Sequence, residues 1–289
     1  MEVHVSSITR RGFLGVGAAV AAGVGASGWT AEEQAARVVK NGRLRQSVSR
    51  WPYRQIPLPE FSRAVADMGL TAIDLLDEPD WPVVRQFGLV CSMGYAGGGS
   101  IPDGLNVKAN HDAIEANFRK LIPRAAAERV PNVITFFGNR RGMKDDEAIA
   151  NSVEGLNRVK RIAEDHGVTI CVELLNSKVD HKDYQGDRTP YGVEIVKAVN
   201  SPRVKLLYDI YHMQIMEGDV IRTIRDSHPH IAHFHTGGVP GRNELDDRQE
   251  LNWRAVAQAI VDVGFGGYLA HEFRPTRDAI TPLYGPEAT

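Results

Sequence analysis

Four ionisable residues stand at the ends of apolar stretches in the second half of the chain. They are Glu173, Asp209, His235 and Glu272, which end the stretches 168–173, 204–209, 231–235 and 267–272. Each stretch is typical of a buried strand, where ionisable side chains are rarely placed for packing alone. Three neighbouring carboxylates repel each other unless a cation or protons intervene. Together with one imidazole they indicate a site for one divalent ion, with Mn²⁺ or Mg²⁺ favoured and Co²⁺ and Zn²⁺ as further candidates.

Such a site requires a fold in which consecutive strands end at the same edge. From residue 44 onward, apolar runs alternate with helical patterns. We predict strands at 44–49, 71–75, 89–93, 133–137, 168–173, 204–209, 231–235 and 267–272. We predict helices at 58–68, 81–87, 111–129, 145–166, 191–199, 220–227 and 253–263. The strands are continuous apolar runs, as in parallel sheets that are buried on both faces.

The alternation predicts an α/β fold, a single (β/α)8 TIM barrel over residues 44–280, with an open doubly wound sheet as the alternative. We expect the eighth helix to be short or missing, because Pro282, Gly285 and Pro286 interrupt the end of the chain. The glycine-rich stretch 94–106 is expected to be an irregular loop. In a barrel the carboxyl ends of the strands converge on one rim, so the four residues should meet there.

The two ends of the chain fall outside the predicted barrel. Arg10 and Arg11 precede an apolar, glycine-rich run at 15–26, which is typical of a twin-arginine export signal over residues 1–31. Residues 32–43 are expected to be a linker and 281–289 a C-terminal tail. This signal predicts a periplasmic or secreted protein, and the run is too short for a stable membrane span.

The formal net charge is −2, without a long basic run after the N-terminus. We therefore expect no nucleic-acid partner. The expected partner is a small-molecule substrate, and a homo-oligomer is left open.

Three segments resemble a known family. The sequences VELLN at 172–176, YDIYHMQ at 208–214 and HEFRP at 271–275 look like those of hydroxypyruvate isomerases. That family belongs to the xylose isomerase-like barrels, which also include ketose 3-epimerases. The resemblance implies that Glu173, Asp209, His235 and Glu272 bind the metal ion, and that Glu173 and Glu272 are also the catalytic acid/base pair. It also implies that His212 and Arg242 contact the substrate. His235 stands where hydroxypyruvate isomerases tend to carry glutamine, and histidine there is more like the epimerase branch.

The expected chemistry is proton transfer at an α-hydroxy carbonyl compound, through an enediolate stabilised by the ion. Returning the proton to the neighbouring carbon gives isomerisation, returning it to the opposite face gives epimerisation, and losing a β-substituent gives elimination. Asn176 and His181, in the loop after Glu173, are further candidates for substrate binding.

A hydroxypyruvate isomerase-like enzyme is the leading hypothesis. A ketose 3-epimerase or a lyase acting on oxidised sugars are the alternatives. An endonuclease-IV-like metal hydrolase and a non-catalytic sugar-binding barrel are less favoured.

Overall fold

The structure is a computed structural model that describes residues 38, 39 and 41–277. The expected export signal, most of the linker and the expected C-terminal tail lie outside these residues. Within the described ranges, no helix is both long and apolar enough to cross a membrane.

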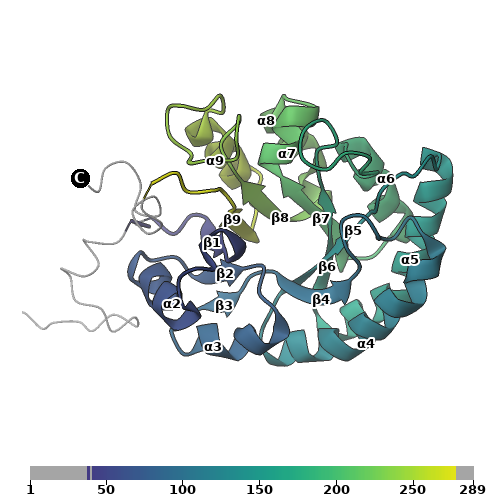
Figure 1. The fold of residues 1–289 in the computed structure, drawn as a ribbon, viewed down its shortest axis with the longest axis horizontal. Coiled ribbons are helices and arrows are strands. Elements are labelled where there is room, and N and C mark those ends of the chain that lie inside the picture. Colours follow the sequence, from purple (N-terminus) through teal and green to yellow (C-terminus); the bar gives the residue numbers. More distant parts are fainter. Residues whose placement is uncertain (1–37, 40, 278–289) are drawn as a thin grey trace, which may run out of the picture. The chain divides into compact units, whose positions relative to one another are not determined.

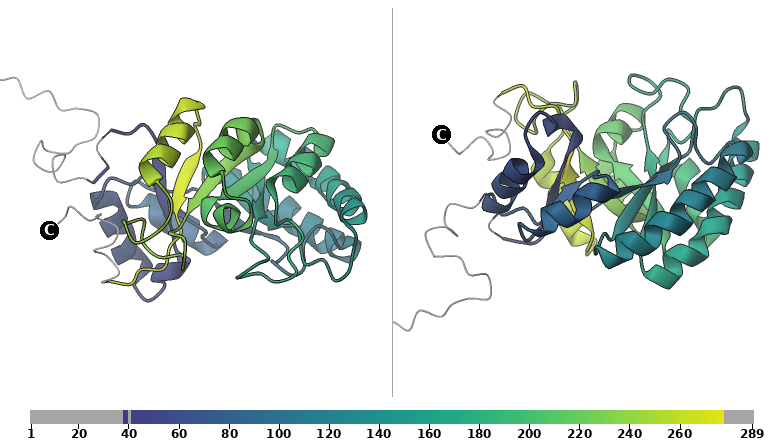
Figure 2. Two further views of the ribbon diagram at one scale, coloured as in Figure 1. Left: turned by 90° about the horizontal axis from the view of Figure 1, so that it is seen from above. Right: turned by 60° about the horizontal axis from the view of Figure 1, so that its bottom comes forward.

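Nine parallel strands form a nearly closed barrel with helices around its outer face (Figures 1 and 2). The strands are β1 (Arg45–Ser49), β2 (Ala72–Asp74), β3 (Val90–Cys91), β4 (Gly94–Gly98), β5 (Asn132–Phe136), β6 (Thr169–Leu174), β7 (Val204–Asp209), β8 (Ile231–Thr236) and β9 (Tyr268–His271). Their order is β3-β2-β1-β9-β8-β7-β6-β5-β4. An isolated bridge between Leu76, which follows β2, and Gly94 of β4 narrows the opening between the two edges. The predicted TIM barrel is confirmed; the third predicted strand, 89–93, is shortened to β3, and β4 is an additional strand.

The predicted helices agree with the structure to within two residues at each end. The helices are α2 (Leu58–Asp67), α3 (Trp81–Arg85), α4 (His111–Ala127), α5 (Asp145–His166), α6 (Thr189–Val199), α7 (Ile210–Met216), α8 (Val220–Ser227) and α9 (Trp253–Asp262). Gly167 ends α5 in the left-handed region, at φ 68°, where glycine has no steric penalty. Helix α7 was not predicted, and it follows β7 without a loop.

The glycine-rich stretch after β3 corrects one prediction. We expected residues 94–106 to be irregular, but residues 94–98 form β4. A Cβ atom on Gly98 would lie 2.6 Å from the carbonyl oxygen of Ile134 and 2.7 Å from the ring of Phe118. A Cβ on Gly94 would lie 2.7 Å from the ring of Trp81. The glycines therefore allow β4 to pack closely against its neighbours, which a strand of larger residues could not do.

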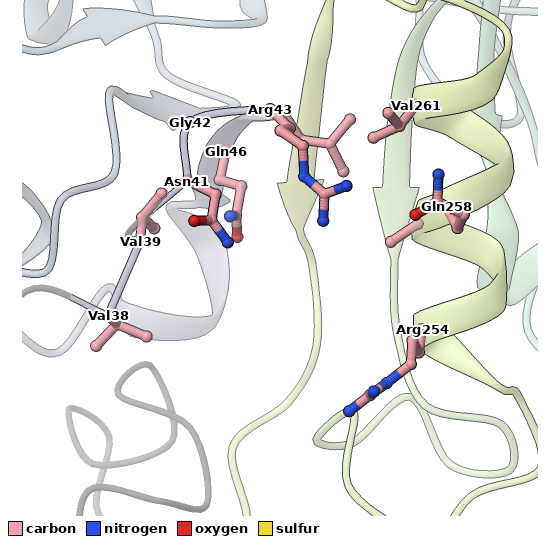
Figure 3. A pocket seen from close by; sticks show the side chains of 11 residues that line it. Val38, Val39, Asn41, Gly42, Arg43, Gln46, Arg254, Gln258 and Val261 are labelled. Carbon is pink, nitrogen blue, oxygen red and sulfur yellow. The ribbon is translucent and has the colours of Figure 1, made fainter.

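The outer face beside β1 and β9 is hollowed. A cavity of about 360 Å³ lies between residues 38–44, which precede β1, and helix α9. Arg254, Gln258 and Val261 of α9 face Val39 and Arg43 across it (Figure 3). A helix following β9 would pack near this position. Residues 272–277 contain no helix, and residues 278–289 lie outside the described part. Among the residues that the structure describes, no carboxylate or histidine lines this cavity, so we do not place the chemistry there.

Candidate active site

The register of the strands brings the four predicted ligands together at one rim. Asp209 pairs with His235 across β7 and β8, Glu173 lies near the end of β6, and Glu272 directly follows β9. One ligand atom from each of the four residues lies within 4.8 Å of the others. The Nδ1 atom of His235 is 2.5 Å from Oε2 of Glu272, 3.4 Å from Oε1 of Glu173 and 3.9 Å from Oδ2 of Asp209. All four residues are buried.

Asp209 has two roles, one on each carboxylate oxygen. Its Oδ1 accepts a hydrogen bond from the backbone N–H of His212 and so caps the N-terminus of α7. Its Oδ2 faces the cluster and accepts a hydrogen bond of 2.9 Å from Arg242. The strand therefore ends on a residue that starts the next helix and also contributes to the site.

His235 is held by a residue that the sequence analysis missed. Its Nε2 lies 2.9 Å from Oδ2 of Asp74, a fully buried carboxylate at the end of β2. Asp74 also contacts Nε2 of His233 at 3.1 Å and accepts a hydrogen bond of 2.6 Å from Ser92. Burial raises the pKa of Asp74, but its contacts with His233 and His235 outweigh that effect and lower the pKa below its ordinary value. The ionised Asp74 accepts a hydrogen bond from the Nε2–H group of His235 and so directs Nδ1 toward the cluster.

Arg242, a predicted substrate contact, lies inside the cluster. Its Nη2 is 2.9 Å from Oδ2 of Asp209 and 2.7 Å from Oε2 of Glu272. The guanidinium also lies over the rings of Trp51 and Tyr211. Burial lowers the pKa of Arg242, but Glu272 and Asp209 raise it above its ordinary value, so the group is charged. Arg242 therefore neutralises part of the carboxylate charge.

His212 and Asn176 lie behind the cluster. The Nδ1 of His212 accepts from the backbone N–H of Asn176 at 3.2 Å, which leaves the proton on Nε2. That Nε2 is 3.5 Å from Oδ2 of Asp209 and has no hydrogen-bond partner of good geometry among the described residues. Burial, followed by Arg242, lowers the pKa of His212 well below its ordinary value, so the ring is neutral. Asn176 uses its side-chain amide for His212, Asp180 and the backbone of its own loop.

The environment moves the pKa values of the two glutamates in opposite directions. Burial raises the pKa of Glu173 to about 7, and nearby Glu272 adds to this effect. Burial also acts on Glu272, but Arg242 and His235 outweigh it and lower its pKa to about 2. Burial raises the pKa of Asp209 to about 6, against the influence of Arg242. Near neutral pH the cluster therefore contains one firmly ionised carboxylate, Glu272, and two carboxyl groups, Glu173 and Asp209, close to their titration points.

A cavity of about 300 Å³ opens above the two glutamates. Its charged and polar walls include Glu173, Glu272, His181, Arg242 and Arg274. Its other side is largely apolar and is formed by Trp51, Leu75, Tyr95, Ile101, Ile134, Phe136 and Leu175. Of the predicted substrate contacts, His181 and Arg242 line this cavity, whereas Asn176 and His212 do not. Trp51 donates a hydrogen bond of 2.6 Å to Oε1 of Glu272 and so fixes one catalytic candidate.

The cluster fits a divalent cation by the chemistry of its donors. Three buried carboxylates and one buried imidazole converge, and Nδ1 of His235 and Oε2 of Glu272 face each other without hydrogen-bond geometry. The second ring nitrogen of His235 is held by a carboxylate, as in most histidines that bind metal ions. Such a donor set suits a hard or borderline divalent ion.

The chain is similar to known proteins over most of its length. The family described as xylose isomerase-like TIM barrel matches residues 19–283. Proteins named "Putative hydroxypyruvate isomerase" from Homo sapiens and Xenopus laevis are 25% and 30% identical over 238 and 157 residues, which cover 81% and 54% of this chain. The matches cover 80% of the human protein and about half (55%) of the Xenopus protein. A 2-oxo-tetronate isomerase from Pectobacterium atrosepticum is 25% identical, with 77% of this chain and 88% of that protein covered.

Solved structures share the fold. An AP endonuclease of family 2 from Brucella melitensis superposes with a TM-score of 0.76 at 22% identity, covering 83% of this chain and 97% of that chain. A D-psicose 3-epimerase from Clostridium cellulolyticum, with D-tagatose, has a TM-score of 0.67 at 20% identity, covering 80% and 85%. These similarities establish the barrel fold.

Proposed function

Because the chain belongs to the xylose isomerase-like TIM barrel family, we propose that it is an isomerase of small hydroxy-keto acids or ketoses. The reaction is a proton transfer between adjacent carbons of an α-hydroxy carbonyl compound. Hydroxypyruvate isomerase-like activity is the leading assignment, since relatives that bear this name match the chain over up to four-fifths of its length.

The observation that supports this proposal is the pair of glutamates under one cavity. Glu272, with a pKa near 2, is a carboxylate that can accept a proton from carbon. Glu173, with a pKa near 7, can hold a proton and release it close to physiological pH. Two groups whose environments push their pKa values apart are typical of an acid/base pair.

Glu173, Asp209, His235 and Glu272 would hold the ion. A divalent ion supplies Lewis-acid stabilisation for negative charge that develops on oxygens of the substrate. Around it, Asp74 orients His235, Trp51 orients Glu272, and the charged Arg242 offers a guanidinium to an anionic group of the substrate. The apolar wall of the cavity excludes water from the reacting carbons.

A ketose 3-epimerase is the second candidate. It is favoured by the histidine at position 235, which resembles the epimerase branch, and by a cavity whose apolar wall extends beyond the space that a three-carbon acid needs. Both activities use the same residues and differ in where the proton returns.

Proton exchange in D₂O tests the proposed function. The purified protein with Mn²⁺ is incubated with hydroxypyruvate, four-carbon keto acids and ketoses, and loss of carbon-bound proton signals is followed by NMR. We expect exchange with at least one compound, and the product distinguishes isomerisation from epimerisation. Absence of exchange across the whole panel, at saturating ion, would refute the proposal.

Substituting Asp74 by asparagine should weaken binding of the ion about 10- to 100-fold, as is typical when the partner of a metal-binding histidine is changed. The reason is that His235 loses the carboxylate that keeps its proton on Nε2. Isothermal titration with Mn²⁺ measures the affinity, and nitrogen-15 NMR of the imidazole reports which nitrogen carries the proton. Ser49→Ala is a mild control, because the Ser49 hydroxyl contacts Asp74 at 3.4 Å. Equal affinity in the wild type and Asp74→Asn would remove Asp74 from this role.

Stabilisation by the ion should increase with pH. The pKa values of Glu173 and Asp209, about 7 and 6, lie above their ordinary values of 4.5 and 3.8. Their neutral forms are therefore favoured by folding, and this contribution is lost as the pH rises through 6 to 7. The ion-free protein should thus be less stable at pH 8 than at pH 5.5, whereas Mn²⁺ should raise the melting temperature more at pH 8, where no protons compete. A larger increase at pH 5.5 would contradict these assignments.

A further inference from the structure

A second cavity borders the active-site cavity and has no part in the chemistry above. Its volume is about 450 Å³, against about 300 Å³ for the first. Tyr95, Ile134 and Phe136 line both cavities. A molecule bound over Glu173 and Glu272 could therefore continue past these three side chains into the second space.

The second cavity lies beside β4, which is an edge strand of the nine-stranded sheet. Ile134 and Phe136 lie on the inner side of β5, because Thr135 between them faces Gly98 and the side of α4 that carries Phe118. Lys120 and Leu121 belong to α4, on the outside of the strands, and they line the same cavity. Between these positions lie Gly97 and Gly98, where the β4–β5 register shifts. The second cavity thus lies beside β4, and its lining combines residues of β5, residues of α4 and the backbone of residues 97–99.

The walls of the second cavity have two chemical characters. Its aromatic and aliphatic lining includes Tyr95, Phe136 and Leu121. Its polar lining includes the side chains of Asp77, Glu78 and Lys120 and the backbone of residues 97–99. Glu78 forms an ion pair of 2.5 Å with Arg124. Asp77 is exposed, and its carboxylate has no side-chain partner in the described part of the chain.

We propose that the second cavity binds a neutral sugar unit attached to the reacting α-hydroxy ketone, so that the preferred substrate is a glycosylated ketose. A sugar ring presents C–H faces that pack on aromatic and aliphatic walls, and hydroxyl groups that donate to carboxylates. An aliphatic tail would desolvate the carboxylates of Asp77 and Glu78 and the ammonium of Lys120 without replacing their hydrogen bonds. This inference rests on the proposed proton transfer at Glu173 and Glu272, and of the two candidate activities it takes the one on ketoses rather than the one on a three-carbon acid.

The test compares one reacting unit with and without the added sugar. Fructose is the short probe, and its glucosylated forms maltulose, leucrose and isomaltulose are the long probes, because each keeps the carbonyl group and the neighbouring hydroxyl free. Proton exchange in D₂O with Mn²⁺ gives kcat/KM for each. We expect at least one long probe to exceed fructose by about tenfold, the scale of one well-packed contact region.

Leu121→Trp places a large side chain in the second cavity, and Leu121→Ala is the matched control that leaves it open. Tryptophan at position 121 should abolish the excess of kcat/KM for the long probe over fructose and leave exchange with fructose unchanged. Alanine should preserve this excess. Asp77→Asn, a milder change of a polar lining residue, should reduce the excess of kcat/KM several-fold. The inference is wrong if every long probe reacts more slowly than fructose in the wild type. It is also wrong if tryptophan affects both kinds of probe equally.

A second measurement separates this inference from the proposed function. Saturation-transfer NMR detects which protons of maltulose, leucrose or isomaltulose contact the protein, whether or not any proton exchanges. Contacts at the glucosyl protons that disappear in Leu121→Trp support the second cavity even if no compound reacts. Exchange with fructose in the absence of such contacts would retain the proposed function and reject the sugar site.

Discussion

Replacing Glu272 by glutamine is expected to lower the rate of proton exchange by about a thousandfold or more, which is within the range for loss of a general base. Glu272 is the carboxylate that Arg242 and His235 keep ionised, and it lines the cavity next to Glu173. Glutamine keeps the shape and an oxygen for the Trp51 hydrogen bond, but it cannot accept a proton. The measurement is exchange in D₂O with the best substrate of the panel, together with circular dichroism to confirm folding.

The control for this substitution is Glu244→Gln. Glu244 is also buried, but its carboxylate is held by Thr276 and does not line the active-site cavity. We expect that variant to retain exchange at nearly the wild-type rate. Because glutamine at 272 also weakens the ligand set, exchange is measured over a titration of Mn²⁺ to saturation. If Glu272→Gln exchanges protons as fast as the wild type, Glu272 is not the base and the assignment of the pair is wrong.

Removing divalent ions should lower the rate of proton exchange about as much as the Glu272→Gln substitution does. Dialysis against a chelator is expected to reduce exchange about a thousandfold, because Lewis-acid stabilisation of the developing charge is worth several kcal/mol. The barrel itself should remain folded, since Arg242 and His235 balance much of the carboxylate charge without an ion. Exchange is followed before chelation, after it, and after adding back Mn²⁺, Mg²⁺, Co²⁺ or Zn²⁺ separately.

If adding back one ion restores proton exchange and raises the melting temperature in parallel, the result would support the four proposed metal ligands. The matched variant is Asp209→Asn, which removes one charged ligand while keeping the N-cap oxygen of α7. It should need a higher concentration of ion for the same activity. Full exchange in the chelated protein, with no ion detected by elemental analysis, would contradict metal dependence and leave an acid/base mechanism alone.

Several features of the site followed from the amino-acid sequence because they depend on local rules. Glu173, Asp209 and His235 each lie at or near the carboxyl end of an apolar strand, and Glu272 follows one. Parallel strands in a barrel bring those ends to one rim, so the four residues meet whatever the details of the loops. The same local logic located α5, whose amphipathic pattern ends at Gly167. The prediction was strongest where a single element decided the position of a side chain.

Only the tertiary structure decided the contacts that arise between distant elements. Asp74 was overlooked because the second strand was predicted to continue past it to residue 75. The signal was present, since a carboxylate in an apolar strand obeys the same strand-end rule, but its contact with His235 joins residues 161 positions apart.

Arg242 lies in a loop whose path no periodicity predicts, and its contact with Asp209 depends on that path. The glycine-rich composition of β4 predicts a loop. In the structure this segment is a strand, and its glycines fit where the neighbouring elements leave no room for side chains. Hydrophobic pattern determined the barrel and its rim, whereas the packing of loops and the close approach of strands determined which charges face each other.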